Sequence, residues 1–178
     1  MENKFRSGIF SLRTVRLGKV AEIMIKKIYG FSAPKNKYHD LFDDKTKERI
    51  EVKFSTVTRR NQIKIRDNNV VIQCIEANEL SNRVISSNEV AGEKFDCNIQ
   101  QVKPLEFDVL YYGLFFYDCI QIYRVKACDV PNITGWSNKQ HKNNIGEGQF
   151  HITDDTFLSH QPRQVKQLSY KELYKLLK

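Results

Sequence analysis

Residues 38–55 read YHDLFDDKTKERIEVKFS, with apolar residues on both sides of the polar run DDKTKER. In the second half, Ile50, Val52 and Phe54 alternate with polar residues, which is the period of a β-strand. The polar run between the two halves supplies a turn, so we expect a β-hairpin over residues 38–56. The apolar side chains of its second strand would face the core, and the charged side chains would face the other way.

The turn sets the register of this hairpin. A loop centred on residues 45–46, of two or four residues, places Leu41 opposite Ile50 on the core face. The same loop places Asp40 opposite Glu51 on the polar face, with their Cβ atoms about 5 Å apart. Two carboxylates at that distance repel each other, so the fold gains nothing from the pair. A divalent cation would reverse the sign of this interaction, and Mg²⁺ prefers such oxygen ligands.

Two neighbours of these carboxylates fit metal-dependent chemistry on a phosphate. The carbonyl oxygen of Val52 lies between the charged residues of the strand and could be a further metal ligand. Lys53 shares a strand face with Glu51 and could hold an attacking water or stabilise developing negative charge. The competing interpretation is an ordinary hairpin with one charged, solvent-exposed face.

A basic helix is expected before the hairpin. Over residues 11–29 apolar side chains recur at the spacing of one helix face, and Gly30 fits the position just after the C-terminus. Glu22 lies beside this face, one turn after Gly18. A glycine there leaves room for a close backbone such as a nucleic-acid strand. The alternative is a surface glutamate paired with Lys26 at i+4.

The remaining segments predict a mixed α/β domain. We expect a strand over residues 69–75 and a helix over residues 94–102. Residues 107–127 are the most apolar and aromatic part of the chain, which predicts two buried strands with a turn near Tyr117. A short helix is expected at residues 169–178.

Charge and composition favour a polyanionic partner inside the cell. The 178 residues are 40% hydrophobic and 28% charged, which is typical of a single globular domain. The net charge of +8 favours nucleic acid as the partner, with an anionic membrane as the second choice. The alternative is a soluble basic protein without such a partner. The four cysteines form no C-x-x-C pair, so we do not expect a zinc knuckle. Without a signal-peptide core or a spanning apolar run, we expect a cytoplasmic protein with no membrane partner.

Three segments, in this order, resemble the PD-(D/E)-x-K nuclease superfamily, the fold of many type II restriction endonucleases and Holliday-junction resolvases. They are RLGKVAE (residues 16–22), YHD (residues 38–40) and IEVKF (residues 50–54). The resemblance implies an α/β fold with a restriction-endonuclease-like core, a mixed central β-sheet flanked by helices in the order αβββαβ. It implies a single nuclease domain, with the catalytic core in residues 1–128 and an extension for DNA recognition or dimerisation in residues 129–178.

The resemblance also implies roles for individual residues. The family pattern has a proline where this chain has His39, and Asp43 or Asp44 are alternatives to the aspartate that the register favours. Gln100 or Gln101 could approach the site, although a position on the surface of the expected helix is the alternative. The residues that match the catalytic positions are Glu22, Asp40, Glu51 and Lys53. The implied ligands of the Mg²⁺ cofactor are Asp40, Glu51 and the carbonyl of Val52, with Glu22 as an outer or second-metal ligand.

Basic and amide side chains are candidates for contacts with double-stranded DNA, because Lys and Arg neutralise phosphates and Asn and Gln match adenine. Solvated polar loops without any DNA contact are the alternative. The candidates are Arg16, Lys19, Arg59, Arg60, Lys64, Asn138, Gln140, His141, Asn143, Asn144 and Gln149. An HNH-like metal site at His141, Asn144 and His151 is a further alternative, but it lacks an evident additional ligand.

Together these features predict a Mg²⁺-dependent type II site-specific deoxyribonuclease of restriction–modification defence. It would hydrolyse phosphodiester bonds in double-stranded DNA and leave 5′-phosphates. A palindromic target would be served by a homodimer. A cognate DNA methyltransferase is implied by the resemblance alone. The alternatives are a structure-selective nuclease of the same fold, either a junction resolvase or a repair enzyme, and a non-catalytic basic DNA-binding protein.

Overall fold

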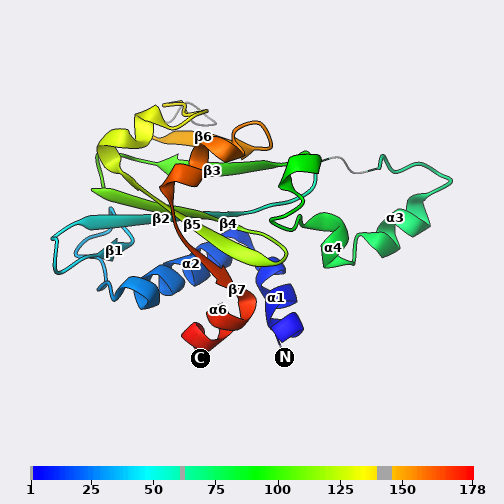
Figure 1. Cartoon of the computed structure of the whole chain (residues 1–178), viewed down its shortest axis with the longest axis horizontal. Helices are drawn as coiled ribbons and strands as arrows, with labels where there is room; N and C mark the ends of the chain where they lie inside the picture. Colours follow the sequence, from blue (N-terminus) through cyan, green and yellow to red (C-terminus); the bar gives the residue numbers. More distant parts are fainter. Residues whose placement is uncertain (1, 61–62, 140–145) are drawn as a thin grey trace.

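Five strands form a central mixed sheet in the structure, a computed structural model that describes residues 2–60, 63–139 and 146–178 (Figure 1). Strand β2 runs parallel to β4, and the other neighbouring pairs are antiparallel. In spatial order the strands are β1 (Leu41–Phe42), β2 (Arg49–Thr56), β4 (Val109–Phe115), β5 (Cys119–Lys126) and β7 (Gln164–Ser169). The two buried strands expected over residues 107–127 are confirmed as β4 and β5.

Three helices cover one face of this sheet (Figure 1). They are α1 (Glu2–Phe10), α2 (Thr14–Tyr29) and α6 (Tyr170–Leu177). Ala21 and Met24 of α2 are fully buried in one core with Ile50 of β2. The helix expected over residues 11–29 is confirmed, and Gly30 follows it in the left-handed conformation with a φ of 73°.

A separate two-stranded ribbon covers the opposite face of the sheet. It pairs β3 (Asp96–Val102) with β6 (Gly148–Thr153) in antiparallel fashion. Ile99 and Phe150 of the ribbon pack in one core with Tyr112 of β4. The sheet therefore has helices on one side and the ribbon on the other, which explains why every residue of β4 is buried.

The helix expected over residues 94–102 is wrong. Phe95, Cys97 and Ile99 are buried, and the residues between them are more exposed, which is the alternation of a half-buried strand. The strand expected over residues 69–75 is also wrong, because this segment forms helix α3 (Val70–Glu76).

The hairpin forms in the expected register, with Leu41 opposite Ile50. The backbone N–H of Asp43 donates to the carbonyl of Glu48 at 2.9 Å, so the loop is the four-residue alternative. The ladder ends at Leu41, and Asp40 does not form the expected next pair with Glu51; its N–H donates to the carbonyl of Ile50 at 3.0 Å. Because β1 is so short, no other described strand lies beside this edge of β2.

The element order differs from the expected αβββαβ, because α3, α4 and β3 lie between β2 and β4. The residues beyond 128, expected as an extension, contribute β7 to the central sheet and α6 to the helical layer. The shorter helices are α4 (Leu80–Arg83), α5 (Phe157–His160), η1 (Val90–Gly92), η2 (Ala127–Asn132) and η3 (Gln161–Arg163).

The helix expected at residues 169–178 is confirmed as α6. The hydroxyl of Ser169 accepts a hydrogen bond from the backbone of Glu172, whose carboxylate accepts one in return from the Ser169 backbone at 2.7 Å. None of the described helices has the length and apolar character needed to cross a membrane.

Candidate active site

The charged residues of β2 lie on the face opposite its apolar residues, as alternation requires. The ammonium of Lys53 is 2.6 Å from a carboxylate oxygen of Glu51. Glu51 is only 8% exposed, and burial raises the pKa of its carboxyl group to about 7. Lys53 opposes this rise in pKa and the carboxylate of Asp40 adds to it. The carboxyl group of Glu51 therefore changes between its protonated and ionised forms near neutral pH.

Lys53 remains a cation at that pH. Burial by itself lowers the pKa of Lys53, but the nearby carboxylates of Glu51, Asp40 and Glu22 outweigh burial and leave the pKa above its ordinary value. A lysine held in this state can donate hydrogen bonds and stabilise negative charge, and it does not act as a base.

Asp40 directly precedes β1, and its side chain is held by β2. One oxygen of its carboxylate accepts a hydrogen bond from the backbone N–H of Val52 at 2.9 Å. The other oxygen accepts no hydrogen bond from the described residues. The N–H and C=O of a strand residue point to the same edge, so the Val52 carbonyl faces the same open edge as Asp40.

Two adjoining hollows at this edge share the side chains of Asp40 and Lys53. The first is also lined by Lys37, Tyr38, His39, Glu51, Gln101, Lys103, Glu106 and Glu147. The second lies between α2 and β3 and is also lined by Thr14, Val15, Gly18, Glu22, Val52, Phe54, Asn98, Ile99, Gln100 and Gln101. The four residues expected to be catalytic thus lie around adjoining hollows: Asp40 and Lys53 line both, Glu51 lines the first and Glu22 lines the second.

Glu22 and Gly18 present the α2 side of the second hollow. Glu22 forms an ion pair with Lys19 at 2.5 Å, not with Lys26 as the alternative interpretation required. This contact raises the pKa of Lys19. A methyl group added at Gly18 would meet no atom within 4 Å in the described structure, so the helix surface there is open.

Sequence reasoning underestimated two residues of the site. Gln101 was expected on a helix surface, but it lies in β3 with a φ of 57°, at a register shift between Ile99 and Val102. A side chain other than glycine at positive φ stores strain, which occurs at functional sites. Strand alternation over residues 96–99 was the signal that could have placed this segment beside the site.

His39 is the second such residue, and it directly precedes Asp40. It is 5% exposed, and its Nε2 accepts a hydrogen bond from the backbone of Lys35 at 3.4 Å. Its Nδ1 has no hydrogen-bond partner among the described residues. Burial lowers the pKa of His39 and nearby Arg49 lowers it further, against the effect of Asp40, so the ring beside Asp40 is neutral at pH 7.

The expected DNA-contacting residues fall into three groups. Arg16 and Lys19 are exposed on α2. Arg59 is bound to Glu89 at 2.9 Å and also to Glu93, and thus has a structural role. Arg60, Lys64 and Asn138 are also exposed. A guanidinium nitrogen of Arg60 lies 3.8 Å from a carboxylate oxygen of Asp96.

The remaining expected DNA contacts belong to the C-terminal part. Gln149 accepts a hydrogen bond from the amide of Asn98 at 3.2 Å, which places it next to the second hollow. Gln140, His141, Asn143 and Asn144 lie outside the described residues. His151, considered for an HNH-like site, has its Nδ1 at 2.6 Å from the Asp96 carboxylate.

The hollow offers few side-chain ligands for a metal ion. Among the described residues, no group of three or more His, Cys, Asp and Glu side chains is suitably placed to bind one. Mg²⁺ keeps several of its waters and needs only one or two carboxylates. The free oxygen of Asp40, the desolvated carboxylate of Glu51 and the Val52 carbonyl are a donor set of this kind, so the residues present fit the ion.

No known family model matches the chain, and no curated protein sequence matches it. The geometry of the site therefore carries the functional inference.

Proposed function

We propose that this protein is a Mg²⁺-dependent endonuclease that hydrolyses phosphodiester bonds in double-stranded DNA. The observation that carries the proposal is the convergence of Asp40, Glu51 and Lys53 at the open edge of β2, facing Glu22 across a hollow. A buried carboxylate such as that of Glu51, with the carboxylate of Asp40 nearby, costs stability in a protein without a ligand. A metal ion and a phosphate would give each of these charges a partner.

The residues of the site divide the chemistry between them. Mg²⁺, when bound, would polarise the scissile phosphate and acidify a water molecule. Asp40 and Glu51 would fix the ion through their carboxylates, together with the Val52 carbonyl. Lys53, which stays protonated, would stabilise the negative charge that develops on the phosphate. Glu22 would orient the water or bind a second ion from the α2 side.

The more specific part of the proposal is a type II restriction endonuclease of the PD-(D/E)-x-K superfamily, with a restriction-endonuclease-like core. Such an enzyme would cut at a defined sequence, leave 5′-phosphates and act as a homodimer beside a cognate methyltransferase. The polar residues of the β3–β6 ribbon support sequence readout, because Asn98 lines the second hollow and donates to Gln149. A two-stranded ribbon has the width that the major groove admits.

The experiment is incubation of the purified protein with unmethylated phage DNA, in Mg²⁺ and in EDTA. We expect discrete fragments that form only with Mg²⁺, and sequencing of their ends should reveal the site and the 5′-phosphates. Fragments of random length would remove the restriction assignment and leave a non-specific nuclease. Equal cutting in EDTA would contradict the metal-dependent site.

The structure-selective alternative keeps the same catalytic residues and changes the substrate. A synthetic four-way junction, added to the same assay, distinguishes the two: cleavage of the junction with no cleavage of linear duplex would assign a resolvase or repair enzyme. Binding to both substrates without cleavage of either would favour the non-catalytic DNA-binding protein.

A further inference from the structure

Residues 63–83 form an arm that extends away from the sheets and carries α3 and α4 (Figure 1). All seven residues of α3 are described and none of them is buried. The large aliphatic side chains of the arm are between 41% and 68% exposed. They are Ile63, Ile65, Val70, Val71, Ile72 and Ile75. An arm of this composition has no core of its own to stabilise it.

The exposed apolar side chains of α3 gather on one face of the helix. Val71, Ile72 and Ile75 share this face, because they are spaced at i, i+1 and i+4. Each of the three is more than half exposed. Monomers seldom leave such apolar side chains grouped on their surface, and a second helix packed on this face would remove them from water.

The charge of the arm favours a protein partner over DNA. Residues 63–83 contain three basic residues (Lys64, Arg66, Arg83) and three acidic residues (Asp67, Glu76, Glu79), so the arm is neutral in a chain of net charge +8. DNA affinity depends on excess positive charge, which the arm lacks. Lys64, expected to contact DNA, belongs to this neutral segment.

The charges of the arm are also arranged to complement a second copy. Lys64 and Arg66 precede α3, with Asp67 between them and the helix, and Glu76 and Glu79 lie at its C-terminal end. If two α3 helices pack antiparallel, the basic pair of each copy meets the acidic pair of the other. Such self-complementarity is the requirement of a two-fold interface.

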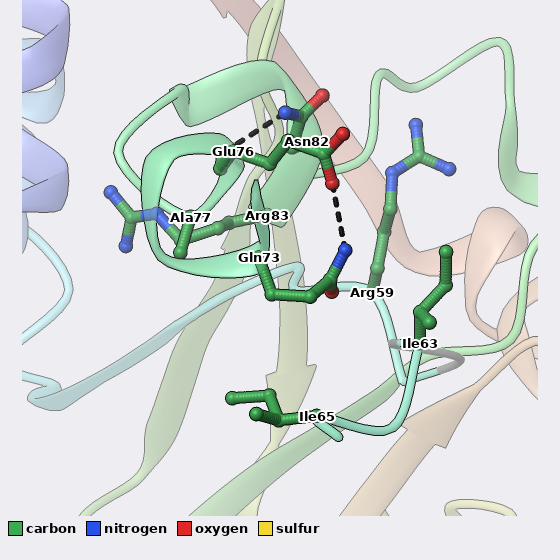
Figure 2. Close-up of a pocket in the computed structure, with 8 residues that line it drawn as sticks. All are labelled: Arg59, Ile63, Ile65, Gln73, Glu76, Ala77, Asn82 and Arg83. Atoms are coloured by element: carbon green, nitrogen blue, oxygen red, sulfur yellow. Dashed lines mark hydrogen bonds between the residues drawn. The ribbon is translucent and has the colours of Figure 1, made fainter. Parts of the chain in front are cut away.

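Two amide side chains in the hollow at the base of the arm are bonded to Glu76. Figure 2 shows Gln73 donating to Glu76 and Asn82 donating to the backbone of Glu76, at 2.9 and 3.0 Å. Ile63 and Ile65 lie on the facing segment of the same hollow. Arg83 also lines the hollow, and its Nε has no hydrogen-bond partner among the described residues, so the hollow offers a partner aliphatic surface and a free donor.

We propose that the arm is the contact surface for a second copy of this chain, with α3 of one copy packed antiparallel on α3 of the other about a two-fold axis. The proposal does not depend on nuclease activity, although it would supply the homodimer expected for that activity. The occupant is a protein surface that is apolar at its centre and charged at its two ends.

The test is the mass of the protein in solution, measured by sedimentation equilibrium without DNA or Mg²⁺. We expect twice the chain mass of 20.9 kDa for the wild type. The double variant Val71→Glu/Ile75→Lys keeps the arm neutral and adds an i,i+4 pair that supports α3. It should weaken dimerisation by at least about 100-fold, because each dimer loses four apolar side chains from its interface.

The matched control is Leu105→Glu/Leu158→Lys, which makes the same charge change at two leucines outside the arm, 91% and 78% exposed. This control should remain a dimer, and both variants should unfold in one cooperative urea transition, which shows that each is folded. A monomeric wild type up to about 100 µM, where even a weak micromolar dimer would form, overturns the proposal. So does a Val71→Glu/Ile75→Lys variant that stays dimeric, or one that loses only affinity for duplex DNA.

Discussion

The carboxyl group of Glu51 is buried next to a second acid, and its pKa of about 7 makes the site sensitive to pH. A raised pKa means that the folded protein holds a proton that the unfolded chain releases. The stabilising effect of that proton is complete below the ordinary glutamate pKa near 4.5 and is lost as the pH rises through 7. The ionised site at pH 8 is therefore under electrostatic stress unless a cation binds.

We predict that the free energy of unfolding in EDTA falls more steeply between pH 4.5 and 7 in the wild type than in Glu51→Gln. The difference should amount to about 2–3 kcal/mol, because Gln cannot lose a proton in the folded state. Urea unfolding at several pH values measures it. Parallel pH profiles for the two proteins would show that Glu51 titrates normally.

Helix α2 combines a structural face and an open face. Its buried residues pack on the sheet, and Gly18 faces the hollow that contains Glu22 and Asp40. A glycine inside a helix costs stability, and at Gly18 it leaves the surface of α2 open to a substrate in the hollow.

We predict that Gly18→Ala raises the free energy of unfolding by about 0.5–1 kcal/mol, since alanine is the better helix former and its methyl group meets no atom of the described structure. The same change should weaken binding of duplex DNA, measured by fluorescence anisotropy. Gly8→Ala in α1 is the control, because its added methyl group is equally free. If both variants bind DNA like the wild type, α2 does not contact the substrate at this point.

The hairpin and α2 were predictable because their signals are local. The period of Ile50, Val52 and Phe54 and the position of the turn determine the register within twenty residues. The same register correctly grouped Glu51 and Lys53 on one face, but it could not show that β1 stops at Leu41. At that point the backbone N–H of Val52 donates to the side chain of Asp40, where a continued ladder would use a backbone carbonyl.

The ribbon and the arm were not predictable in this way. β3 pairs with β6, which is about fifty residues further along the chain, so its short apolar pattern fits either a strand or a helix until the partner is known. The segment VVIQCI has the β-branched residues of a strand, but no described strand lies beside it and it forms α3. The position of Gln101 beside the hollows results from the same β3–β6 pairing, so it was not predictable from the local sequence either.

The whole molecule carries its positive charge mainly outside the arm. The central sheet and its helices hold most of the excess positive charge, whereas the only charged residue of the β3–β6 ribbon is Asp96. Arg16 and Lys19 are exposed on α2, which borders the second hollow, whereas Arg59 is held by two glutamates. Phosphate contacts are therefore expected around the site and not at Arg59.

We predict that Arg16→Ala makes the negative slope of log association constant against log salt concentration shallower by about 1, as expected when one phosphate contact with DNA is lost. Arg66→Ala, which removes an exposed arginine from the neutral arm, is the control and should leave the slope unchanged. A salt titration of the anisotropy signal measures both. Equal slopes for Arg16→Ala and the wild type would place the DNA elsewhere on the surface.

The most direct test of the account is single-turnover cleavage of duplex DNA in Mg²⁺ by three proteins: the wild type, Asp40→Asn and Asp44→Asn. Asparagine at position 40 can still accept the hydrogen bond of the Val52 backbone, so the fold should persist while the charge that holds the metal is lost. We predict a loss of at least about 100-fold for Asp40→Asn, and a wild-type rate for Asp44→Asn, whose side chain is exposed in the hairpin loop. Cleavage by Asp40→Asn at the wild-type rate would contradict the account.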